Sequence, residues 1–228
     1  MQKGDLRKQQ ILASAEKLFL QRGFEKTSIQ DVLDSMKLSK GGFYHHFESK
    51  GALLECICRQ RTEDALKAKL AQLPFDATAV GRINTLYASC GLFAINDALF
   101  TAMLVKAACK SDGASLRAAM LATTDDAILP LLTDAVEKGS ASGELHPYES
   151  ADIAARLLLH LGAGLFEDAA FAITENKPNA MDTVLDCLTG YRKAAEILLG
   201  APYASIALAD MKLIDRIRRI IADDPRLQ

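Results

Sequence analysis

The segment SKGGFYHHFESK, Ser39 to Lys50, concentrates the side chains of this chain that are best suited to polar recognition. It holds a tyrosine, two adjacent histidines and two lysines, together with a pair of glycines. A glycine costs roughly 1 kcal/mol in a helix, so two in succession favour close approach of the backbone to another surface. His45 and His46 would project about 100° apart on a helix, with no carboxylate or cysteine at ligand spacing. A metal site is therefore a poor interpretation.

A helical wheel divides this segment into two faces. Phe43 and Phe47 are four residues apart and share the face that would pack on a core. Tyr44 and His45 fall on the other side, where they could bond to base edges or phosphates in a DNA major groove, and Gly41 would let the backbone approach. The plainer alternative is that Tyr44 and His45 are ordinary surface residues.

Two helices lead up to this segment. Apolar residues at spacings of three and four predict a helix from about residue 5 to 22, ended by Gly23. Thr27 and Gln30 match a capping box, in which Thr27 would cap the amide of Gln30 and open a short second helix.

The segment itself begins with a helix start signal. After a turn at Lys37, Ser39 is the expected N-cap of a very short third helix that ends near residue 46. Residues 48–50 then open a long fourth helix, which Pro74 stops. Two short helices joined by a tight turn, with the second one exposed, make a helix-turn-helix.

Beyond residue 74 the pattern stays helical. Turn signals separate predicted helices at about 77–95, 97–110, 114–138, 149–175, 180–199 and 203–222. The last is amphipathic and mixes basic with acidic residues, so packing on the body or on a dimer mate is a better interpretation than a membrane surface. We expect an all-α fold with a helix-turn-helix domain at 1–50, joined by the long helix to an all-helical effector-binding and dimerisation domain at 51–228.

The composition and the distribution of charge favour a globular protein with one polyanion-binding region. Half of the 228 residues are hydrophobic and a quarter are charged, as in soluble globular proteins. Residues 1–61 hold 11 Lys+Arg and 7 Asp+Glu, a net charge of +4, so with −2 for the whole chain the remainder carries −6. A basic head on an acidic body indicates that the head alone meets a polyanion. We expect a cytoplasmic chain with no membrane or targeting segment.

The cysteines and the catalytic residue types form no recognisable site. Five scattered cysteines are a poor disulfide framework, so we expect reduced, half-buried thiols and no metal. We find no nucleophile-base pair, metal spacing or phosphate loop, and expect no catalytic residues, no cofactor and no enzymatic activity.

The run ILASAEKLFLQRGFEKTSIQDVLDSMKLSKGGFYHHFESKGALL, Ile11 to Leu54, resembles the DNA-binding domain of the TetR (tetracycline repressor) family of bacterial transcriptional regulators. Its pieces A-x-x-L-F-x-x-x-G-F, T-S-I-x-D-V and S-K-G-x-F-Y-x-H-F-x-S-K occur in the family's order. The resemblance covers about the first fifth of the chain.

The resemblance implies two sets of DNA contacts. Base or groove contacts are expected at Lys40, Gly41, Tyr44, His45 and His46. Phosphate contacts are expected at Thr27, Ser28, Ser39 and Lys50.

Three residues depart from the family pattern. Lys37 stands where the turn often holds a glycine, which predicts mild strain from a left-handed backbone. Gly42 replaces a more usual polar residue and would loosen the recognition helix. Gly51 replaces a helix-favouring residue and would loosen the start of the fourth helix.

A dimer surface is expected in the C-terminal half, since helix-turn-helix proteins usually bind DNA as two-fold dimers. Small residues within 151–174 would let helices approach closely, and the resemblance implies that this helix and the one at 180–199 form a four-helix bundle with a dimer mate. The alternative is that both are simply the core of a monomer. The expected interface residues are Leu158, Leu161, Gly162, Leu165, Phe166, Leu188 and Tyr191.

The candidate effector contacts are Phe93, Asn96, Phe100, Met103 and His160. Their mixture of apolar walls and isolated polar groups suits a small, largely hydrophobic effector, although for each of them a core residue is the better interpretation.

These expectations combine into one hypothesis and one alternative. The hypothesis is a homodimeric repressor that binds a palindromic DNA operator and releases it when an effector binds. The alternative is a helical small-molecule-binding or scaffold protein without operator recognition, against which the intact Lys40, Tyr44 and Lys50 argue.

Overall fold

The computed structural model describes residues 3–74, 76–88, 97–110, 113–175 and 179–227. These ranges contain helices and no strand, which confirms the predicted all-α fold. The helices are α1 (Lys3–Arg22), α2 (Ile29–Met36), α3 (Lys40–Tyr44), α4 (Lys50–Leu70), α5 (Ala79–Tyr87), α6 (Ala98–Ala108), α7 (Ala114–Ser142), α8 (Ala151–Thr174), α9 (Ala180–Leu199) and α10 (Met211–Asp223).

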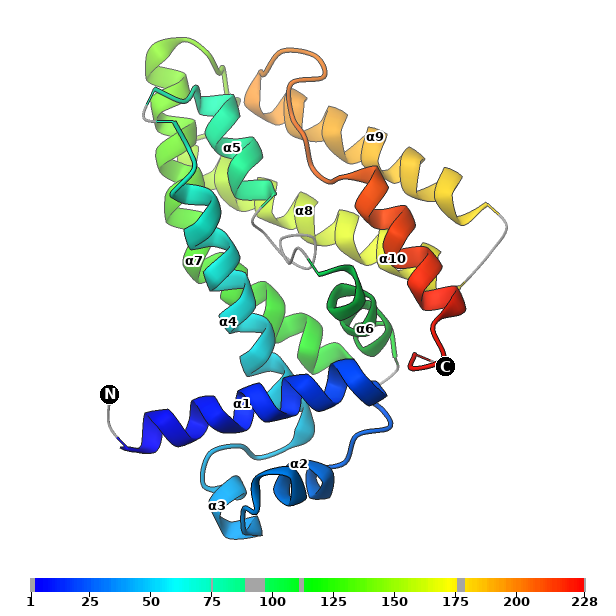
Figure 1. Cartoon of the computed structure of the whole chain (residues 1–228). Helices are drawn as coiled ribbons and strands as arrows, with labels where there is room; N and C mark the ends of the chain where they lie inside the picture. Colours follow the sequence, from blue (N-terminus) through cyan, green and yellow to red (C-terminus); the bar gives the residue numbers. More distant parts are fainter. Residues whose placement is uncertain (1–2, 75, 89–96, 111–112, 176–178, 228) are drawn as a thin grey trace.

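The first three helices form a head at one end of the molecule (Figure 1). α1 ends at Gly23, whose φ of +89° is the left-handed cap that the sequence predicted. Phe43 and Phe47 are buried under α3, as the helical wheel predicted. The face of α3 opposite these rings is thereby left at the outer end of the head.

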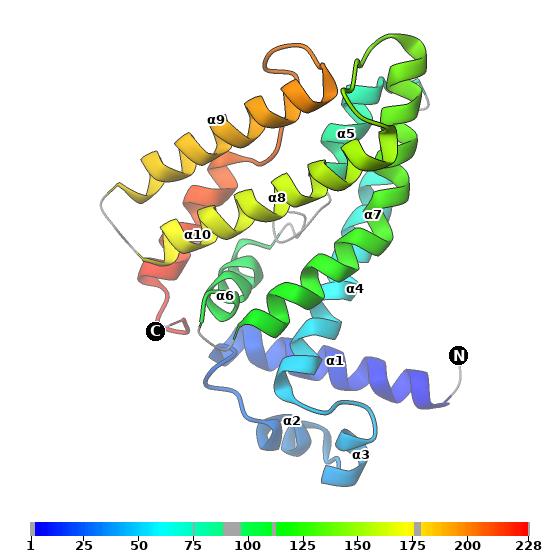
Figure 2. The same cartoon turned by 180° about the vertical axis from the view of Figure 1, so that it is seen from behind.

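α4 leaves the head and runs into the body beside α7 (Figures 1 and 2). α5 and α7 pack together at the far end, and α8 packs along both α7 and α9. α10 returns along α6 and brings the C-terminus back toward α1 (Figure 1). The predicted long connecting helix and the predicted packing of the last helix on the body are both confirmed.

Several predicted helix ends were wrong. α4 ends at Leu70, four residues before Pro74, α5 ends at Tyr87 rather than near residue 95, and α7 ends at Ser142 rather than near residue 138. α10 begins at Met211 rather than near residue 203. The segment before α10 is held out of a helix by the α5 side chain Asn84, which donates to the Ser205 carbonyl and accepts from the Ala207 amide, both at 2.8 Å. Ile206 and Leu208 of this segment are buried although its backbone is not helical, so their apolar character resembled a helical pattern in the sequence.

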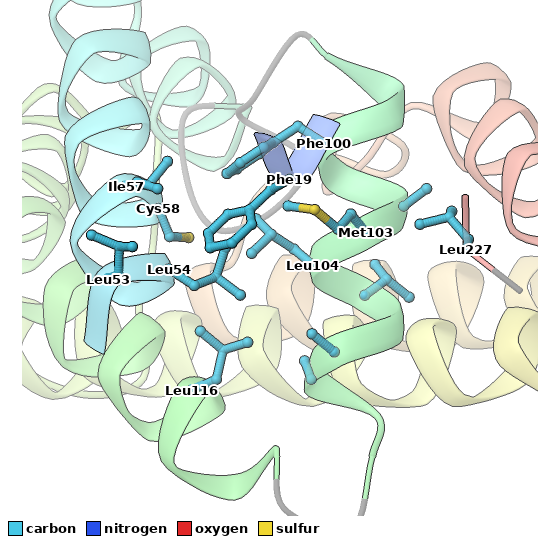
Figure 3. Packing of buried hydrophobic residues seen from close by; sticks show 14 of the residues in the cluster. Phe19, Leu53, Leu54, Ile57, Cys58, Phe100, Met103, Leu104, Leu116 and Leu227 are labelled. Carbon is cyan, nitrogen blue, oxygen red and sulfur yellow. The ribbon is translucent and has the colours of Figure 1, made fainter. Parts of the chain in front are cut away.

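One hydrophobic cluster continues from the head into the body (Figure 3). Phe19 of α1 lies between the apolar side chains of α4 and those of α6, and Leu227 of the C-terminal tail joins the cluster from the other side of α6. A second cluster fills the space between α5, α7, α8 and α9. The head therefore has no hydrophobic core that is separate from α6 and α10.

Replacement of Phe19 by alanine should lower the free energy of unfolding by about 3 to 5 kcal/mol, because the ring is buried and its removal leaves a cavity. The matched control is Leu6→Ala on the same helix, where the side chain is 51% exposed and the change should be within about 0.5 kcal/mol. Urea denaturation followed by circular dichroism measures both. Equal losses for the two variants would show that the cluster does not hold the head in place.

Candidate nucleic-acid interface

The second helix is opened by Ser28 and not by Thr27. The Ser28 hydroxyl accepts a hydrogen bond from the Asp31 amide at 3.1 Å, and the Asp31 carboxylate accepts from the Ser28 amide at 2.8 Å. The predicted box of Thr27 with Gln30 was therefore wrong by one residue, and Gln30 instead donates to Asp34 at 2.7 Å. Ser28 is exposed, and the free amides of the helix start lie beside it.

Thr27 is placed differently from its expected role. Its side chain is 1% exposed, and its hydroxyl donates to the Gly23 carbonyl at 2.8 Å. The side chain thus closes the turn between α1 and α2 and is not open to a DNA phosphate in this conformation. Ser28 carries the exposed hydroxyl of the pair.

Lys37 and Ser39 fix the direction of α3. Lys37 has φ 51° and ψ 44°, the left-handed conformation that its position in the turn predicted. The Ser39 hydroxyl accepts from the Gly42 amide at 3.2 Å and caps α3, also as predicted. A Cβ at position 42 would lie 2.9 Å from Leu38 Cδ1, so glycine lets Leu38 pack under the helix.

The outer face of α3 carries polar side chains. Lys40, Tyr44 and His45 are exposed, with 53% of Tyr44 accessible. A Cβ built on Gly41 would meet nothing within 4 Å, so the backbone there is open to an approaching surface. His46 is half-buried, and its ring stands edge-on to that of His45 at 5.0 Å.

Lys50 has a role in the fold that its sequence position did not reveal. Its ammonium donates to the Phe24 carbonyl at 2.9 Å and lies 4.3 Å from the centre of the Phe24 ring. Burial, aided by the charge of Lys110 and opposed by that of Glu25, lowers the pKa of Lys50. Lys50 therefore ties the start of α4 to the turn between α1 and α2, and a phosphate contact would compete with these bonds.

Neither the thiols nor the other ligand types assemble a reactive centre in the described residues. No group of three or more His, Cys, Asp and Glu side chains is placed to hold a metal ion there. Burial raises the pKa of Cys58 to about 12, and burial also raises the pKa values of Cys109 and Cys187. These thiols stay protonated near neutral pH.

The three candidate effector residues that the structure describes do not share one site. Phe100 and Met103 are buried on α6, whereas His160 is exposed on α8. Phe93 and Asn96 lie outside the described residues. A hollow of about 470 Å³ opens between the end of α4 and α5, and residues such as Gln72 and Thr85 line it.

The candidate dimer residues divide into inner and outer positions. Leu158 and Leu165 are buried within the chain itself, whereas Leu161, Gly162, Phe166, Leu188 and Tyr191 are partly exposed. The Tyr191 hydroxyl donates to Asp168 at 2.8 Å and bridges α9 to α8.

Sequence reasoning missed the apolar side chains that α8 and α9 expose most. The three on α8 are 4 and 14 residues apart, which places them on one face of that helix, and the two on α9 are 12 residues apart. They are Ile153, Leu157 and Phe171 on α8 and Leu185 and Ile197 on α9.

A family model described as bacterial regulatory proteins of the tetR family matches residues 11–57, which run from within α1 through α2 and α3 to the start of α4. This part of the chain belongs to the TetR family. The TetR-family match thus falls on the helices that present Tyr44 and His45 at the outer end of the head.

Individual TetR-family relatives match over different lengths. A transcriptional regulator of Bacillus subtilis, YerO, is 42% identical over 52 residues, which are 23% of this chain and 18% of that relative. The match thus spans less than a fifth of that protein. The regulator UidR of Escherichia coli is 27% identical over 160 residues, 69% of this chain and 79% of the relative.

The fold is also that of solved TetR-family structures. A TetR-family transcriptional regulator from Pectobacterium atrosepticum matches with a TM-score of 0.57 and 17% identity, over 89% of this chain and all of the other. The likeness therefore extends to the helical body, where the family model does not reach.

The capping box makes stability depend on pH through Asp31. Hydrogen bonds from the Ser28 hydroxyl and amide, with a smaller effect of the Arg22 charge, hold the pKa of Asp31 below its ordinary 3.8. This stabilisation is present above pH 3.8 and is lost as the pH falls through the lower pKa of the folded state. Asp31→Asn should lower the urea midpoint at pH 6, and the gap to wild type should narrow below pH 3.8. A gap that stays constant with pH would contradict this role.

Proposed function

We propose that this TetR-family protein binds a palindromic DNA operator as a homodimer, acts as a repressor, and is released by a small, largely hydrophobic effector. The observation that carries the proposal is the outer face of α3, where Lys40, Tyr44 and His45 are exposed beside an open Gly41. A cytoplasmic location follows from the proposed DNA partner. By length and composition α8 could cross a membrane. This is weak evidence for a membrane span, because the core helices of soluble proteins pass the same test.

Base recognition is assigned to the face of α3 and backbone contacts to its surroundings. Tyr44 and His45 can bond to base edges or phosphates in the major groove, and Lys40 supplies positive charge. His46 is a secondary contact, because it is half-buried. The amides at the start of α2, with Ser28, and those at the start of α3, with Ser39, suit phosphate oxygens. Lys50 would reach a phosphate only by leaving the Phe24 carbonyl.

A dimer surface is proposed on α8 and α9. Ile153, Leu157 and Phe171 of α8 and Leu185 and Ile197 of α9 are between 38% and 67% exposed. Large apolar side chains that recur on neighbouring helices are typical of interfaces. A two-fold copy packed there would cover them and set the separation of the two α3 helices.

Release requires a mechanical link between body and head, and Arg61 of α4 supplies one. Its guanidinium pairs with Glu16 of α1, lies 3.1 Å from the Asp97 carboxylate at the start of α6, and covers the Phe100 ring at 4.2 Å. An effector that moved α6 would therefore pull on α1 and α4 together. A coupling of roughly 1 to 3 kcal/mol would be enough for release.

Tyr44→Ala should weaken binding to the DNA upstream of the protein's own gene by about tenfold or more, because a base or phosphate contact is lost. The matched control is Tyr148→Ala, another tyrosine that is exposed by 82% but lies between α7 and α8. Fluorescence anisotropy at low salt measures both. If the protein binds none of this DNA, or if the two variants lose the same affinity, the scaffold alternative is favoured instead.

Leu185→Glu should convert the proposed homodimer into a monomer, because a dimer mate would have to bury the new carboxylate. Leu6→Glu is the control, since both leucines are 51% exposed and Leu6 lies on α1. Light scattering coupled to size-exclusion chromatography reports the mass. A monomeric wild-type protein, or a dimer that survives Leu185→Glu, would remove this surface from the proposal.

A further inference from the structure

A cavity of about 140 Å³ lies where the head, α6 and the C-terminal tail meet. Four cationic side chains line it: Lys26 from the turn before α2, Lys106 and Lys110 from α6 and its end, and Arg226 from the tail. Among the described residues, Glu25 is the one carboxylate in this lining. The cavity is therefore a positively charged junction between segments that are far apart in the sequence.

The C-terminal tail closes one side of this cavity. Arg226 donates to the Leu20 carbonyl at 3.0 Å, and Lys26 donates to the Pro225 carbonyl at 2.8 Å. The tail backbone is so close to Gly23 that a Cβ there would lie 2.1 Å from the Arg226 carbonyl oxygen. The cavity is therefore built by specific contacts that hold the tail against the end of α1.

Three of the four cations already have partners that fix their positions. Lys110 pairs with Glu25 at 3.0 Å, Arg226 pairs with Asp224, and Lys26 bonds to the Pro225 carbonyl. Lys106 is half-buried, and its ammonium has no hydrogen bond or ion pair within the described part of the chain. Lys106 can therefore take an anionic partner without giving up an existing contact.

Apolar side chains also line the cavity. Met103 on α6 and Leu227 on the tail line it, and both are buried in the cluster that also holds Phe19 (Figure 3). The site thus offers cationic and apolar groups in a small volume. That arrangement suits a compact molecule with one negatively charged group.

We propose that this cavity binds a small oxyanion, a phosphate or carboxylate group on a compact molecule, with Lys106 as its principal contact. The site lies at the junction of head and body and is distinct from the DNA-facing side of α3. Because the ligand would touch Lys26 of the head and Lys106 of the body together, it stabilises their packing. The inference goes beyond operator recognition and is tested without DNA.

The test is isothermal titration of the full-length protein with inorganic phosphate and, separately, with butyrate, at an ionic strength held constant with sodium chloride. Wild type should bind at least one of the two anions, and its melting temperature should rise with that anion more than with chloride. Lys106→Gln should weaken this binding by about tenfold or more, because a charge-assisted contact is lost. The two titrations distinguish a phosphate from a carboxylate ligand.

Lys67→Gln is the matched control, because Lys67 is exposed on the distant half of α4 and does not line the cavity. It should bind the anion as wild type does. If Lys106→Gln fails to fold by circular dichroism, Lys110→Gln takes its place and should show the same loss. No binding of either anion by wild type, or equal binding by wild type and the folded cavity variant, overturns the proposal.

One further outcome concerns the source of the anion. If neither small anion binds and Lys106→Gln instead weakens DNA binding while lowering the salt slope by about one, the cations serve the DNA backbone and the proposal is wrong. Failure of operator recognition alone would leave the anion titrations unaffected. The two proposals therefore fail separately.

Discussion

The packing of Phe19 and its neighbours between α4 and α6 is the contact on which the rest of the molecule depends. The same cluster contains Phe43 of α3 and Leu227 of the C-terminal tail. Core side chains are close-packed, since voids are costly. A movement of α6 would therefore disturb the packing of α1 and of the start of α4, on which α3 rests.

Polar contacts hold the head at defined points in addition to this packing. Arg61 connects α1, α4 and the start of α6, whereas Lys50 connects α4 to the turn before α2. The tail makes a third connection through Arg226. Each of these contacts is partly exposed and contributes modestly by itself. Together they restrain the head at separate points.

The sequence predicted the features that depend on nearby residues. Gly23, Ser39 and the pair Phe43 and Phe47 act within one or two turns of helix, and the structure has them as predicted. The choice between the hydroxyls of Thr27 and Ser28 as the helix cap was missed although it is local, because the Thr27 hydroxyl instead donates to the Gly23 carbonyl. Features that depend on distant residues were missed as well. The conformation of the segment before α10 is set by hydrogen bonds to Asn84, which lies more than a hundred residues away in the sequence.

The candidate interface residues on α8 could also not be sorted into buried and exposed positions from the sequence alone. A helix of small and apolar residues gives little contrast between its faces, so Leu158 and Leu157 look alike in the sequence although one is buried and the other exposed. Packing against α7 and α9 decides which side turns inward, and Tyr87 then bonds to the Leu158 carbonyl to fix it. The apolar side chains that remain exposed lower the solubility of the chain and add nothing to its hydrophobic core. Their recurrence on both α8 and α9 is accounted for most simply by a surface that another protein chain covers.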